Sequence, residues 1–118
     1  MNKTFPSSEK LKSRKAIELL FTEGKSVKSY PVKVFYLPSE TIKSSQAAFA
    51  VPKRNFKNAV DRNRIKRQLR ESYRLHKQLL ITNKEQKFTL LFLYLSKDKL
   101  PYETIEKAMI SSLKKIIE

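Results

Sequence analysis

The spacing of apolar residues along the chain predicts three helices. Near the N-terminus, Ile17, Leu20 and Phe21 recur at the i, i+3, i+4 spacing of one helical face. We therefore expect a helix over about residues 13–22. Gly24, the only glycine in the chain, follows this helix. Because a residue with positive φ often ends a helix, we expect Gly24 to adopt that conformation.

The longest predicted helix covers about residues 58–80. Its apolar and small residues fall on one arc of a helical wheel, which is the side expected to face the core. This arc consists of Ile65, Leu69, Ser72, Tyr73, His76, Leu79 and Leu80. A third helix is expected over residues 102–117. Its predicted buried stripe consists of Ile105, Met109, Leu113 and either Ile116 or Ile117.

Three runs of apolar residues predict strands at residues 32–37, 47–51 and 88–95, and residues 27–30 are a candidate for a short extra strand. The run at 88–95 shows no alternation of polarity, so we expect it to be covered on both faces, at the centre of the sheet. The predicted order is α-β-β-α-β-α. This order favours an α+β fold, a two-layer sandwich with a small mixed sheet.

Length and composition indicate one domain, residues 1–118, of which residues 1–10 form a loosely ordered arm. The chain has no cysteine, and 40% of its residues are hydrophobic. Its longest apolar run, residues 90–95, is far shorter than the roughly 20 residues that span a bilayer. The first residues lack the apolar stretch of a signal peptide. We therefore expect a cytoplasmic protein with no membrane partner.

Basic residues far outnumber acidic ones, 26 to 11, for a net charge of +15. The excess is greatest in residues 53–77, where ten basic residues stand against two acidic ones. A solvated helix face normally mixes charges of both signs, but Lys66, Arg70 and Arg74 repeat the same sign at i, i+4. Self-repulsion of this size favours a polyanionic partner such as nucleic acid.

Candidate catalytic and metal-binding groups are few. His76 is the only histidine and falls on the apolar arc, which favours a structural role, and no second His or Cys stands at metal-ligand spacing. Asp61 and Glu71 are too far apart along the helix to form a catalytic pair, and we expect each to pair with a nearby arginine. The sequence predicts no catalytic residue, no metal site and no cofactor bound by the protein itself.

Lys33 and Phe35 lie on one face of the strand predicted at 32–37, and Val32 and Val34 lie on the other. An aromatic ring beside a cation on an open sheet face suits base stacking and phosphate contact. The alternative is that Phe35 is a core residue beneath a helix. The residues alone favour neither interpretation.

Residues 53–71 resemble the signature of the protein subunit of bacterial ribonuclease P. From Asn58, the chain reads Asn-Ala-Val, one residue, Arg-Asn-Arg-Ile-Lys-Arg, two residues, Arg-Glu. The resemblance covers nearly the whole chain, including residues 21–27 and the loop at 100–102. Three positions depart from the family's usual residues: Ile17 often corresponds to an aromatic residue, Pro52 to a small polar one and Lys57 to glycine.

This resemblance implies an α+β sandwich with a left-handed βαβ crossover, against the usual rule. It also implies a binding subunit, non-catalytic alone, that assists a catalytic RNA in hydrolysing the 5′ leader from precursor tRNA. Mg²⁺ would be held through the RNA, and no obligate protein partner is evident. The residues expected to bind the RNA subunit are Lys53, Arg54, Lys57, Asn58, Arg62, Asn63, Arg64, Lys66, Arg67 and Arg70. Those expected to bind the leader, between the first helix and the sheet, are Ile17, Phe21, Lys33 and Phe35.

Two other function classes fit the same composition. One is a structural RNA-binding protein of the ribosome or another ribonucleoprotein. The other is a DNA-binding domain that inserts the long helix in the major groove, but the basic arc has few Asn, Gln or Ser side chains to read base edges. Stimulation of a ribonuclease P RNA at low Mg²⁺ would separate the three classes.

Overall fold

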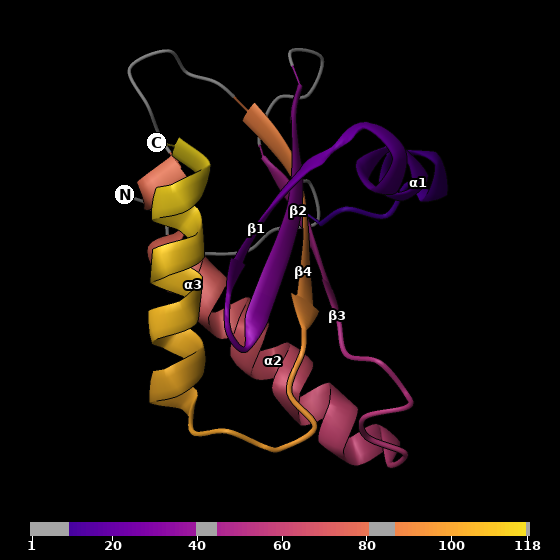
Figure 1. Cartoon of the computed structure of the whole chain (residues 1–118), viewed down its shortest axis with the longest axis vertical. Helices are drawn as coiled ribbons and strands as arrows, with labels where there is room; N and C mark the ends of the chain where they lie inside the picture. Colours follow the sequence, from indigo (N-terminus) through magenta and orange to yellow (C-terminus); the bar gives the residue numbers. More distant parts are fainter. Residues whose placement is uncertain (1–9, 40–44, 81–86, 118) are drawn as a thin grey trace.

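The computed structural model describes residues 10–39, 45–80 and 87–117, and Figure 1 shows their arrangement. The elements are α1 (Arg14–Glu23), β1 (Lys25–Ser29), β2 (Val32–Ser39), β3 (Gln46–Ala50), α2 (Ala59–His76), a 3₁₀ helix (Lys77–Leu80), β4 (Lys87–Tyr94) and α3 (Tyr102–Ile117). The predicted α+β class is confirmed. The candidate extra strand exists as β1, and the long helix ends in a 3₁₀ turn. The predicted arm, apart from Lys10, lies outside the described residues.

The sheet has the order β1-β2-β4-β3. β4 pairs with β2 in antiparallel fashion and with β3 in parallel fashion, so the sheet is mixed, as predicted. The predominantly apolar β4 therefore occupies a central position, and most of its side chains are buried. α2 joins β3 to its parallel neighbour β4, which makes β3-α2-β4 the crossover for which the family resemblance implies a left hand.

The main hydrophobic core lies between one face of the sheet and the helices α2 and α3. Side chains from alternate strand positions meet the apolar faces of both helices. The buried residues from the strands are Val32, Val34, Ala47, Phe88, Leu90, Phe92 and Tyr94. Those from the two helices are Ile65, Leu69, Tyr73, Ile105, Ala108, Met109, Leu113 and Ile116. Ile116 and not Ile117 thus completes the stripe of α3, because Ile117 is exposed.

The opposite face of the sheet is covered by α1. A second, smaller cluster there contains the buried residues Leu11, Leu20 and Leu91, with Ile17 and Phe35 packed against it. The Leu11 N–H donates a hydrogen bond to the Ala47 carbonyl (2.9 Å), so the chain before α1 lies along β3. α1 is short, and the strand residues that it covers incompletely remain accessible.

Gly24 follows α1 but does not have a positive φ. Its φ is −73° and its ψ is 161°, so the prediction of a left-handed conformation was wrong. A Cβ at this position would collide with the Leu20 carbonyl oxygen and would lie 3.1 Å from the Tyr36 carbonyl oxygen. Glycine is required because a side chain here would collide with the Leu20 carbonyl of α1 and would also crowd the Tyr36 carbonyl of β2.

Candidate nucleic-acid interface

The loop before α2 is held by the side chains of two residues that we predicted to bind RNA. Asn58 is the N-cap of α2, and its Oδ1 accepts a hydrogen bond from the Val60 N–H at 2.9 Å. Arg62 Nη1 donates to the carbonyl oxygens of Phe56 (2.7 Å) and Lys57 (3.0 Å). Asn58 and Arg62 therefore shape the beginning of α2, and their polar groups are partly occupied by the protein itself.

A second loop, residues 95–101, follows β4 and contacts the region around the beginning of α2. The Asn55 side-chain amide donates to the Ser96 carbonyl (3.4 Å), and Lys99 Nζ lies 3.4 Å from Asp61 Oδ1. Asp61 thus pairs with a lysine from another loop, and the expectation that it pairs with an arginine was wrong. These contacts fix the first turn of α2 relative to the end of β4.

The basic residues of α2 and its preceding loop form a surface that is almost free of negative charge. Lys53, Arg54, Lys57, Asn63, Arg64, Arg67 and Arg70 are exposed, and Lys66 is half-buried. The buried side of the helix carries Ile65, Leu69, Ser72 and Tyr73, which accounts for the exposure of the opposite side. Among the described residues, Arg64, Lys66, Arg67 and Arg70 have no carboxylate partner, so their charges are available to an external anion.

Farther along α2 the positive charge is partly neutralised. Arg74 Nη2 lies 2.5 Å from Glu71 Oε1, and its Nε donates to Glu71 Oε2 at 3.1 Å, as we predicted for Glu71. The hydrogen bond from Arg74 holds the pKa of the Glu71 carboxyl below its ordinary value. His76 Nε2 lies 2.9 Å from Glu106 Oε2 of α3, consistent with the structural role expected for it. Apart from Arg62, the cations of α2 without a carboxylate partner among the described residues thus lie between Arg64 and Arg70, before this pair.

The four predicted leader-binding residues come together on the face of the sheet that α1 covers. The Phe21 and Phe35 rings lie 4.9 Å apart at an interplanar angle of 60°. Lys33 Nζ lies 5.0 Å from the centroid of the Phe35 ring, and Ile17 packs against the same cluster. Phe35 is therefore both a packing residue and a surface residue. Phe21 is 57% exposed, which leaves its ring accessible next to the Phe35 ring that Lys33 approaches.

A hollow of about 390 Å³ lies where β3 and β4 end. It is lined by Pro52, Arg54, Asn55, Leu93, Tyr94, Leu95 and Lys97. Only Arg54 among these was predicted to contact RNA. Neighbouring parallel strands end at the same edge of a sheet. A sequence-based prediction that β3 pairs with β4 would therefore have placed Lys97, which follows β4, near the loop that follows β3. The residue pattern did not predict that pairing; only the family resemblance implied a βαβ crossover.

No group of three or more His, Cys, Asp or Glu side chains in residues 10–39, 45–80 and 87–117 is arranged to hold a metal ion. Within those same segments, no helix is both long enough and apolar enough to cross a bilayer. The residues predicted to bind RNA thus form a basic surface on α2 and an aromatic surface between α1 and β2.

The fold and these two surfaces define an α+β RNA-binding protein. A family model described as Ribonuclease P matches residues 5–117. The ribonuclease P protein component of Porphyromonas gingivalis is 40% identical over 114 residues, which cover 92% of this chain and 83% of that protein. The chain belongs to the ribonuclease P protein family.

Solved structures of two RNase P proteins share the fold. The protein from Thermotoga maritima matches with a TM-score of 0.76 and 23% identity, over 91% of this chain and 96% of that one. The protein from Staphylococcus aureus matches with a TM-score of 0.74 and 23% identity, over 92% and 94% of the respective chains. The family assignment favours the ribonuclease P interpretation over the ribosomal and DNA-binding alternatives.

Proposed function

We propose that this protein binds the catalytic RNA of ribonuclease P through the part of α2 up to Arg70 and the loop before it. The observation that carries this proposal is the set of cations Arg64, Lys66, Arg67 and Arg70, which have no carboxylate partner among the described residues. Arginine suits such a contact because its planar guanidinium binds phosphate oxygens in pairs. Lys53, Arg54, Lys57 and Asn63 extend the same surface, while Asn58 and Arg62 act mainly by shaping it.

The single-stranded 5′ leader of precursor tRNA is proposed to bind on the other face of the sheet. There the exposed ring of Phe21 offers a surface for base stacking, and Lys33 offers a cation for the adjacent phosphate. Ile17 and Phe35 pack against the hydrophobic cluster beneath α1 and help to position the Phe21 ring and the Lys33 side chain. Because the α2 surface and the leader surface lie on opposite faces, one protein can contact both RNAs at the same time.

Cleavage of the precursor is assigned to the RNA subunit, with Mg²⁺ held through that RNA. The protein supplies binding energy, charge neutralisation and orientation of the leader. We further propose that the complex works in the cytoplasm, where precursor tRNAs are matured.

Reconstitution tests the proposal. Added to a ribonuclease P RNA at low Mg²⁺, the protein should restore removal of the 5′ leader, and the variant with Arg67→Ala and Arg70→Ala should need a higher protein concentration for the same rate. The protein freed of all RNA should leave precursor tRNA intact at any Mg²⁺ concentration. Cleavage by the RNA-free protein, or full stimulation by the double variant at the wild-type concentration, would contradict it.

A further inference from the structure

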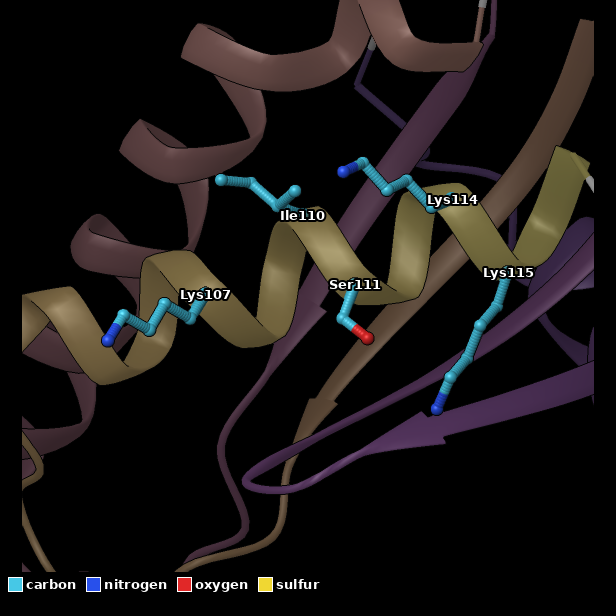
Figure 2. A pocket seen from close by; sticks show the side chains of 5 residues that line it. All are labelled: Lys107, Ile110, Ser111, Lys114 and Lys115. Carbon is cyan, nitrogen blue, oxygen red and sulfur yellow. The ribbon is translucent and has the colours of Figure 1, made fainter.

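The outer side of α3 carries a hollow of about 400 Å³ that the proposed function does not use (Figure 2). Its lining residues come from one helix: Lys107, Ile110, Ser111, Lys114 and Lys115. Three of the five are lysines and none is acidic. The hollow is therefore a basic surface that also offers a hydroxyl group.

The lysines are spread along the helix and around it. In Figure 2, Lys114 runs back along α3 toward Ile110, whereas Lys115 reaches toward the β1–β2 hairpin. Lys115 Nζ donates a hydrogen bond to the Lys28 carbonyl at 2.7 Å, which anchors this cation at the edge of the sheet. Lys107 and Lys114 are exposed and stand two helical turns apart, or about 10.5 Å along the axis. Such a spread suits an extended chain of phosphates better than a single small anion.

The charge of these lysines is not neutralised within the described part of the chain. Lys107 and Lys114 form no ion pair there, and Glu106 of the same helix is engaged by His76 at 2.9 Å. The dipole of a helix favours cations in its last turn. The presence of Lys114 and Lys115 at the end of α3 is therefore explained without any ligand. It does not account for Lys107, in the middle of α3, or for the hollow between these side chains.

The position of α3 indicates which RNA would fill the hollow. α2 and α3 cover the same face of the sheet, and Figure 1 shows α1 on the other side of the strands. An RNA body that covers the basic surface of α2 can continue across α3. A leader held by Phe21 and Phe35 lies on the opposite face and is directed away from it.

We propose that the hollow on α3 binds the phosphate backbone of the ribonuclease P RNA, as a second contact with the RNA that α2 binds. This inference rests on the proposed function. The hydroxyl of Ser111 would donate to a phosphate oxygen, while Lys107 and Lys114 would neutralise neighbouring phosphates. Lys115 is held by Lys28 and adds a fixed positive charge.

The test compares protein variants for binding to the ribonuclease P RNA alone, over a range of salt concentrations. The variant with Lys107→Gln and Lys114→Gln should lower the slope of log affinity against log salt by about 1.4–1.8, because each phosphate contact contributes about 0.7–0.9. A matched variant with Lys12→Gln and Lys15→Gln, on the α1 side, removes the same charge and should keep the wild-type slope. Equal slopes for the two variants would overturn the proposal.

A second measurement uses the unmodified protein and so does not depend on any variant's folding. Lys107 and Lys114 should react with an amine-specific reagent in the free protein and should be protected at least several-fold by the RNA subunit. Undiminished reactivity in the complex would overturn the proposal. If Arg67→Ala and Arg70→Ala weaken binding while the α3 lysines stay reactive, only the α3 contact fails. If those α2 substitutions have no effect, the proposed function itself fails.

Discussion

The Phe21 ring of α1 lies 4.9 Å from the Phe35 ring of β2, centroid to centroid, and the two rings differ in what else they contact. Phe35 packs against the cluster of Leu11, Leu20 and Leu91, whereas 57% of Phe21 is exposed. Phe35 thus belongs partly to the fold, and Phe21 is the ring that a base can reach. A substitution that tests leader binding therefore has to distinguish the loss of a base-stacking ring from the loss of packing within the fold.

Phe21→Ala should weaken binding of precursor tRNA to the reconstituted enzyme by about five-fold or more, because one base–aromatic stack is worth roughly 1–3 kcal/mol. Binding of mature tRNA, which has no leader, should hardly change. Affinities of both RNAs for the two enzymes provide the measurement. Phe35→Ala should reduce precursor binding as well, with an added loss of protein stability. An equal loss on precursor and mature tRNA for Phe21→Ala would assign this ring a role in folding alone.

Arg67→Ala should lower the salt dependence of binding to the RNA subunit. The Arg67 side chain is exposed and unpaired among the described residues, so its removal should delete about one phosphate contact. The slope of log affinity against log salt should then fall by about 0.7–0.9. Replacing Arg64, Lys66, Arg67 and Arg70 together should lower it roughly in proportion. A slope that survives all four substitutions would place the RNA-binding surface elsewhere.

Arg62→Ala should destabilise the protein, unlike Arg64→Ala two residues along the helix. The Arg62 guanidinium donates to the Phe56 and Lys57 carbonyls, and its loss leaves both without this donor. We expect the free energy of unfolding to fall by about 1–2 kcal/mol, the lower part of the range for charged hydrogen bonds, because the group is only half-buried. Urea unfolding of both variants measures this. Unchanged stability with weaker RNA binding would mean that Arg62 serves the RNA only.

Gly24→Ala should lower stability although Gly24 has an ordinary φ. The added methyl would collide with the Leu20 carbonyl and press on the Tyr36 carbonyl, both of which belong to backbone that cannot move freely. Overpacking of this kind costs typically about 1–3 kcal/mol. Thermal unfolding of Gly24→Ala and of Ser26→Ala, an exposed neighbour in β1, provides the comparison. Equal melting temperatures would show that the end of α1 can shift at little cost.

The local pattern of the chain determined its helices and strands. The i, i+3, i+4 spacing in α1, α2 and α3 and the apolar run of β4 predicted these elements, because periodicity reflects which side of each element is buried. The signature from Asn58 to Glu71 and the concentration of positive charge indicated the family and the kind of partner. These properties depend only on neighbouring residues.

Tertiary structure decided what each residue does within those elements. Only the packing of α1 on the sheet brings Phe21 to Phe35, and only the loop before α2 turns Arg62 inward while Arg64 and Arg67 stay exposed. The close approach of the Leu20 and Tyr36 carbonyls, and not a positive φ, explains Gly24. The hollow on α3 was likewise not apparent from spacing. Contacts between distant segments depend on how whole elements pack, which a pattern of neighbouring residues does not encode.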